Sequence, residues 1–179
     1  PRHATFADAD AALEWCENQV LGAAATGLET RFSLGQLAIF AGLTSAEIRL
    51  LESIVATQLY KAGDVIIREG DEAHLFYVIA RGSVAVRLRG PDVQPGKGRR
   101  VATFGPGLSF GEIALFDGGK RSADIVAEEP VVCYGFAVEA LREIGKEHPN
   151  LLVTILTNVT RELSERLRRA NEEIRALET

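Results

Sequence analysis

The chain has 179 residues, of which 46% are apolar, and its formal net charge is −5. This length and composition suit one globular domain with helical extensions. Binding to duplex DNA usually depends on clustered Lys and Arg, so an acidic chain argues against nucleic acid as a partner. No apolar run reaches the about 18–20 residues that cross a bilayer. We therefore expect no direct membrane insertion and a cytoplasmic location.

The first predicted element is an amphipathic helix over residues 5–21, "TFADADAALEWCENQVL". Its acidic first turn suits the positive end of a helix dipole. The small residues that follow this helix predict a linker over 23–33. The chain starts without Met and contains none, which suggests a piece of a longer protein.

The main domain is predicted over residues 34–148. Helical structure is expected over 34–56, where Thr44 and Glu47 have the spacing of a capping box. From about residue 59 to 136 the chain consists of short β-rich runs broken by Gly, Pro and Asp. Such runs predict an antiparallel sandwich or barrel rather than alternating βα units.

Two helices are predicted at the end of the chain, over 137–148 and over 149–179. The second is long, and its apolar residues recur mostly at spacings of three and four, with one stutter in the heptad pattern. Two explanations remain open: a self-associating coiled coil that makes a homodimer, or packing of this helix back on its own barrel. The stripe consists of Leu152, Ile155, Leu156, Val159, Leu163, Leu167, Ala170, Ile174 and Leu177.

The long helix also carries four arginines that are balanced by four glutamates. This pattern predicts a solvated or interhelical set of charges rather than a nucleic-acid-binding face. The residues are Arg161, Arg166, Arg168 and Arg169, with Glu162, Glu165, Glu172 and Glu173.

The segment that best suits ligand binding is residues 110–124, "FGEIALFDGGKRSAD". Ionised Glu112 accepts hydrogen bonds only, so it suits the hydroxyls of a sugar. Arg121 offers a planar fork that grips an anionic phosphate. Gly111 allows close backbone approach, and residues 113–116 are expected to form one helical turn with free amides. Together these features predict a site for a phosphorylated ribose.

This segment resembles the phosphate-binding cassette of the cyclic nucleotide-binding domain family, in its catabolite-activator-like form. The matching motifs are Phe110-Gly111-Glu112-Ile113-Ala114-Leu115 and Arg121-Ser122-Ala123-Asp124-Ile125. Residues 60–86 resemble the first strands of the family, and the likeness covers about residues 35–175. The resemblance implies a mainly β fold, an antiparallel β-roll or jelly-roll with flanking helices and a long C-terminal helix.

The resemblance also implies the role of each site residue. Glu112 would receive the ribose 2′-hydroxyl, and Arg121 would pair with the cyclic phosphate, helped by the Ser122 hydroxyl and backbone amides. Arg166 stands where a related regulator contacts the adenine, so it is a candidate base contact. Lys120 replaces the proline that often precedes the arginine. The implied ligand-binding set is Gly111, Glu112, Ile113, Ala114, Arg121, Ser122, Ala123 and Arg166.

The resulting interpretation is a regulatory sensor that prefers cAMP over cGMP, a choice that depends only on the bacterial character of the sequence. Ligand binding would be transmitted through the C-terminal helices to an effector domain of the parent chain. The alternative is a degenerate family member that binds no nucleotide and serves as a dimerisation or scaffold module. Residues 5–21 are similar to the last helix of STAS domains; the alternative is a generic amphipathic helix. The similarity implies that residues 1–22 end a preceding domain and that the parent is a bacterial transporter or glutaminase. A transporter parent would tether this domain to the inner membrane.

No enzymatic or metal chemistry is expected from this fragment itself. His3, His74 and His148 are isolated, and no H-x-H or H-E-x-x-H occurs. Cys16 and Cys133 match no metal or redox spacing, so they are expected to be reduced thiols.

Overall fold

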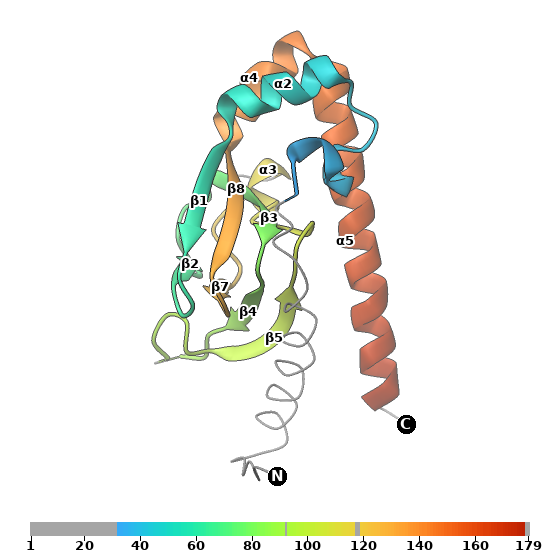
Figure 1. The fold of residues 1–179 in the computed structure, drawn as a ribbon. Coiled ribbons are helices and arrows are strands. Elements are labelled where there is room, and N and C mark those ends of the chain that lie inside the picture. The colour runs from blue at the N-terminus through green and yellow to red at the C-terminus, as the bar shows by residue number, and fades with distance from the viewer. Residues whose placement is uncertain (1–31, 92, 117–118, 178–179) are drawn as a thin grey trace, which may run out of the picture. The chain divides into compact units, whose positions relative to one another are not determined.

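The computed structural model describes residues 32–91, 93–116 and 119–177 of the chain (Figure 1). The helix expected over 5–21, and with it the STAS-like segment, lies outside the described residues. Among the described helices, none is long and apolar enough to cross a membrane.

The described residues form two four-stranded sheets in which all paired strands are antiparallel. This architecture confirms the predicted antiparallel β-roll. The first sheet has the order β1 (Ala56–Tyr60), β8 (Val131–Ala137), β3 (Leu75–Arg81) and β6 (Ser109–Phe110). The second has the order β2 (Val65–Ile67), β7 (Asp124–Ala127), β4 (Val84–Leu88) and β5 (Arg99–Phe104).

The first sheet is covered on both faces, and β3 shows how the sequence achieves this. Side chains alternate between the two faces of a strand. Phe76 and Val78 belong to the core shared with the helices, whereas Tyr77 and Ile79 belong to the core between the two sheets. The described part of the chain therefore has three layers, in which helices pack on the first sheet and the first sheet packs on the second. The strand β3 in the central layer is an almost continuous run of apolar residues.

The expected helical segment over 34–56 is only partly correct. Two single 3-10 turns, η1 (Leu34–Gln36) and η2 (Ala38–Phe40), come first, and the α-helix α2 spans Ser45–Ile54. Gly42 has a φ of +90°, which interrupts a right-handed helix. The helix then begins at the predicted capping box, because Thr44 and Glu47 exchange side-chain to backbone hydrogen bonds.

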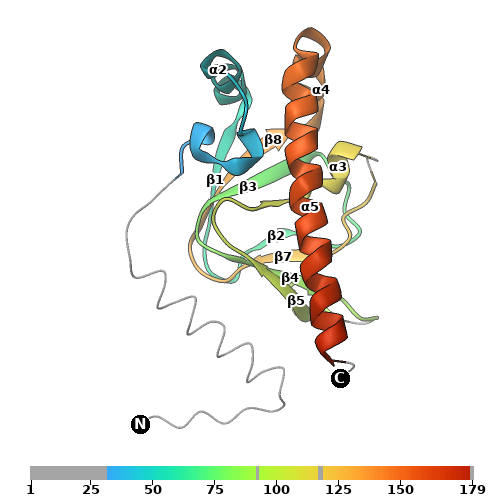
Figure 2. The ribbon, with the colours of Figure 1, turned by 90° about the vertical axis from the view of Figure 1, so that its right-hand side faces the viewer.

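The C-terminal helices agree with the expected boundaries: α4 spans Val138–Glu147 and α5 spans Pro149–Leu177. In the view of Figure 2, α5 runs from α4 past α3 (Ile113–Phe116) to the level of β4 and β5. Proline suits the first turn of a helix, where its missing N–H is not needed.

The apolar stripe of α5 divides into two parts. Ile155 and Val159 are fully buried in the core that joins the helices to the first sheet. Asn158 strengthens this attachment by donating from Nδ2 to the carbonyl oxygens of Ile39 and Ala41 at 3.0 and 2.9 Å. Further along, Leu167 is 63% exposed and Ile174 is 55% exposed. Packing on its own domain therefore accounts for the first part of the stripe, and the second part lies at the surface.

Candidate functional site

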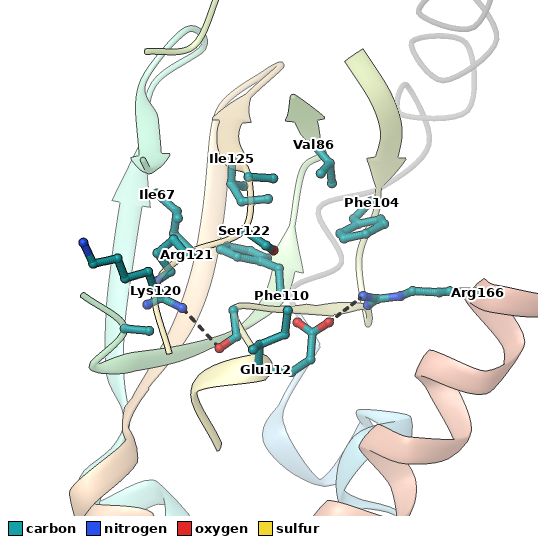
Figure 3. Close-up of a pocket in the computed structure, with 14 residues that line it drawn as sticks. Ile67, Val86, Phe104, Phe110, Glu112, Lys120, Arg121, Ser122, Ile125 and Arg166 are labelled. Carbon is teal, nitrogen blue, oxygen red and sulfur yellow. Dashed lines mark hydrogen bonds and ion pairs between the residues drawn. The ribbon is translucent and has the colours of Figure 1, made fainter. Parts of the chain in front are cut away.

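A cavity of about 130 Å³ lies between the segment that follows β6, the start of β7, the sheet of β4 and β5, and α5. One wall is apolar and the opposite end is polar, as Figure 3 shows. The apolar wall consists of Ile67, Val86, Phe104, Phe110 and Ile125. The polar end contains Glu112, Arg121, Ser122 and Arg166. An apolar hollow with a few convergent polar groups is the usual form of a small-molecule site.

Arg121 is fixed by its neighbours on both its main chain and its side chain. Its N–H donates to the Asp71 carbonyl and its own carbonyl accepts from Gly70, both at 2.9 Å. Its Nη1 donates to the Gly111 carbonyl at 3.1 Å and its Nη2 to the Leu75 carbonyl at 2.6 Å. Burial lowers the pKa of Arg121 below its usual range, but a guanidinium stays charged at neutral pH. The structure therefore holds an oriented cation at the edge of the cavity.

Gly111 lies against this cation and has a φ of +73°. A Cβ added at this position would lie 2.4 Å from Nη1 of Arg121. Glycine is thus required twice, for the left-handed backbone and for the close approach of the guanidinium.

Glu112 is the buried anion of the site, with 8% of its surface exposed. Burial raises the pKa of Glu112 above its usual 4.5, because the charged form loses its hydration, while the charge of Arg166 acts in the opposite direction. Its Oε1 is 3.5 Å from Nη1 of Arg166. Glu112 and Arg121 therefore have different partners, and the cavity lies beside both.

Arg166 reaches this site from α5. Its guanidinium lies 4.1 Å from the centre of the Phe104 ring, a cation–π contact. It also donates from Nη2 to Glu162 and to the Ser109 carbonyl. Glu162 in turn accepts hydrogen bonds from the Ser109 N–H and hydroxyl, both at 3.0 Å. For these two residues the expectation of a solvated or interhelical pattern is wrong, because both side chains face the barrel and are less than one fifth exposed.

Asp124, at the end of the cassette, is fully buried and binds neighbouring segments of the chain. Its Oδ1 accepts from the Glu69 N–H at 2.7 Å and its Oδ2 from the Gly96 N–H at 2.6 Å. Arg89 places its Nε 3.5 Å from Oδ1. This carboxylate joins three separate segments of chain next to Arg121.

The structure gathers most of the residues that the sequence analysis selected. The residues of that set that line the cavity are Gly111, Glu112, Ile113, Arg121, Ser122, Ala123 and Arg166. Ala114 lies in α3, the single helical turn expected over 113–116, and its side chain is outside the described part. Lys120 also borders the cavity, but its side chain is exposed and directed away from Glu112 (Figure 3).

The sequence analysis missed Ser109, Glu162 and Asp124 as parts of the site. The one available signal was that Glu162 precedes Arg166 by four residues, which places both side chains on one face of a helix. For Asp124 the only signal was its place in the cassette motif.

A wider depression of about 520 Å³ lies beside α4. Two pairs of its side chains contact each other: His74 with Glu72, and Arg142 with Glu139, each at 3.0 Å. These pairs are exposed and local in sequence, so the cavity at Arg121 is the better candidate site. Among the described residues, no group of three or more His, Cys, Asp or Glu gathers in a metal-binding arrangement.

Comparison with known proteins places these observations in a family. The sequence model described as "Cyclic nucleotide-binding domain" matches residues 57–148. Glutaminase 2 of Bradyrhizobium diazoefficiens is 33% identical over 171 residues, which are 94% of this chain and 26% of that protein. The cyclic AMP receptor protein of Thermus thermophilus is 33% identical over 136 residues, which are 76% of this chain and 60% of that protein.

A solved structure of similar fold is a cyclic nucleotide-binding domain from Methylobacillus flagellatus. It superposes with a TM-score of 0.69 and 26% identity, over 82% of this chain and 80% of that one. This chain spans about a quarter of the glutaminase and three fifths of the receptor protein.

Proposed function

Because this chain belongs to the cyclic nucleotide-binding domain family, we propose that its cavity binds cAMP in preference to cGMP and acts as a regulatory sensor. The observation that carries the proposal is the arrangement of Arg121 and Glu112. Each is held by a different partner, and both border one apolar hollow. A cation and an anion kept apart in this way suit a ligand that has a phosphate on one side and hydroxyls on the other.

We propose the ligand-contact roles that the family resemblance implies, and this arrangement supports them. Glu112 receives the ribose 2′-hydroxyl, with the Gly111 backbone beside it. Arg121 pairs with the cyclic phosphate: two of its five N–H groups already bind carbonyl oxygens, which orient the fork and leave donors for the ligand. The exposed Ser122 hydroxyl and the backbone amides of Ala114, Ser122 and Ala123 also contact the phosphate. The base lies along the apolar wall, and Arg166 contacts it from α5.

The preference for cAMP is supported by the relatives. The receptor protein of Thermus thermophilus is named for cyclic AMP, and its match includes most of this chain. Titration of the purified domain with cAMP and with cGMP by calorimetry tests the proposal. We expect saturable binding of both, with the smaller Kd for cAMP. If neither ligand gives a heat of binding, the alternative of a degenerate scaffold module is favoured. A smaller Kd for cGMP would contradict the preference for cAMP but not the binding of cyclic nucleotides.

The wider role that we propose is regulation of a larger bacterial protein. Ligand at the cassette would shift α4 and α5 between two arrangements, and α5 would convey the change to an effector domain of the same chain. A glutaminase parent is favoured by the match of 94% of this chain to Glutaminase 2. A STAS-containing transporter is the other candidate, and either would place this domain in the cytoplasm.

We also propose that the exposed second part of the α5 stripe forms a homodimer. Removing α5 is not a suitable test, because Leu151, Ile155 and Val159 are fully buried in the core of the domain. Instead, glutamate replaces Leu167 and Ile174 together, two residues that are more than half exposed. We expect the dimer to weaken about tenfold or more, since an apolar contact would be replaced by like charges.

Sedimentation velocity over a concentration series measures this effect. Replacement of Arg168 and Arg169 with glutamine is the control, because it changes exposed residues of the same helical segment without removing apolar surface. A double glutamate variant that sediments like the unchanged protein contradicts this interface.

A further inference from the structure

The side chain that we assign to the base, Arg166, lies against the anion that we assign to the ribose. Its Nη1 is 3.5 Å from Oε1 of Glu112, and Figure 3 shows this contact crossing the polar end of the cavity. The two residues are 54 positions apart in the sequence. Their side chains are only 19% and 11% exposed, so solvent screens their interaction less than that of a surface pair.

Arg166 is kept in this position by a small bridge between α5 and β6. Glu162 accepts two hydrogen bonds from Ser109 and pairs with Arg166, and Arg166 also donates to the Ser109 carbonyl. Ser109 is two residues before Gly111, so the bridge fixes α5 at the beginning of the cassette. The Nε of Arg166 is nevertheless buried without a hydrogen-bond partner among the described residues. The Nη2 atom of Arg166 thus has hydrogen-bond acceptors, whereas its Nε has none among the described residues.

We propose that Arg166 competes with the ribose 2′-hydroxyl for Glu112, and so determines how strongly the domain discriminates ribose from 2′-deoxyribose. This inference rests on the proposed function. A carboxylate that faces a cation is a weaker acceptor for a neutral hydroxyl than one without such a partner. When the hydroxyl binds, Arg166 leaves Glu112, and its unsatisfied Nε turns to the base. Replacement of Arg166 by the hydroxyl at Glu112 moves a side chain of α5. Binding of the sugar therefore changes a contact between α5 and the cassette.

The test compares cAMP with 2′-deoxy-cAMP in the unchanged domain and in Arg166→Ala. Affinities are measured at about pH 8, where carboxylates are ionised, by displacement of a fluorescent cAMP analogue. The ratio of the two affinities isolates the 2′-hydroxyl, because any contact of Arg166 with base or phosphate contributes equally to both ligands. We expect the affinity for cAMP divided by the affinity for 2′-deoxy-cAMP to rise by about three- to tenfold in Arg166→Ala. The reason is that the 2′-hydroxyl would then bind the charged Glu112 without a competing cation.

Arg168→Ala is the matched control, because it removes the same charge from an exposed position two residues further along α5. Its ratio should equal that of the unchanged domain. An Arg166→Ala ratio that is unchanged or lower overturns the competition while leaving cAMP binding intact. If the unchanged domain binds neither ligand, the proposed function fails, and this inference fails with it.

Discussion

Replacement of Arg121 with alanine is expected to weaken cAMP binding by about 1.5–3 kcal/mol, or about 10- to 150-fold in Kd. The loss is large because the guanidinium is already oriented at the edge of the cavity. Two backbone carbonyls hold it in place before the ligand arrives, so little of its side-chain freedom remains to be lost on binding. Calorimetry with cAMP gives the change in Kd directly.

Two further variants separate charge from geometry. Lys120→Ala removes the neighbouring cation, which is exposed and directed away from Glu112, so we expect less than about a threefold change in Kd. Arg121→Lys retains a charge but cannot bind both carbonyls and a phosphate with one ammonium group, so its Kd should lie between those of the unchanged domain and Arg121→Ala. An unchanged Kd in Arg121→Ala removes Arg121 from the phosphate-binding role.

The features that could be predicted from the sequence are those that depend on neighbouring residues. The capping box at Thr44 needs only the spacing to Glu47, and the single turn of α3 follows from the cassette motif. The short apolar run of β3 and the turn residues that bound it similarly predict a strand in a roll. The motif of fifteen residues is therefore sufficient to predict that Glu112 and Arg121 belong to one site.

The contacts that complete the site join segments far apart in the chain. The Ser109–Glu162 hydrogen bonds span 53 residues, and the bond from the Glu69 N–H to Asp124 spans 55. A repeat of apolar residues along one segment cannot predict hydrogen bonds between residues so far apart. Each partner is an ordinary polar residue within its own segment. Arg166 illustrates the limit: the charge pattern does not separate it from Arg168, and the family resemblance implies only a base contact. Its contact with Glu112 becomes visible only from the position of α5 on the roll.

Asp124→Asn is expected to lower the free energy of unfolding by about 3 kcal/mol, and the melting temperature by about 6–12 °C. Both carboxylate oxygens accept backbone N–H groups, from Glu69 and from Gly96. The amide of asparagine offers only one such oxygen, so its NH₂ would face a buried N–H donor. Arg89 would also lose the anion that lies 3.5 Å from its Nε. Thermal unfolding followed by circular dichroism measures the loss.

Asp64→Asn is the matched control, because Asp64 accepts a backbone N–H within an exposed turn of four residues. Its melting temperature should change by less than about 2 °C, as expected for an exposed position. Equal shifts for both variants would mean that Asp124 has no special structural role.

The Asp124 variant should also bind cAMP more weakly, although Asp124 itself does not line the cavity wall. The segment that its carboxylate holds at Glu69 continues into Gly70 and Asp71, which form the two backbone hydrogen bonds with Arg121. When that segment loosens, the guanidinium loses its fixed orientation, and ordering it again costs part of the binding free energy. Saturating cAMP should then recover part of the lost melting temperature, because a ligand that binds only the folded state stabilises it. Asp124 thus makes the phosphate site depend on contacts between three distant segments, which explains why the motif alone is not the whole site.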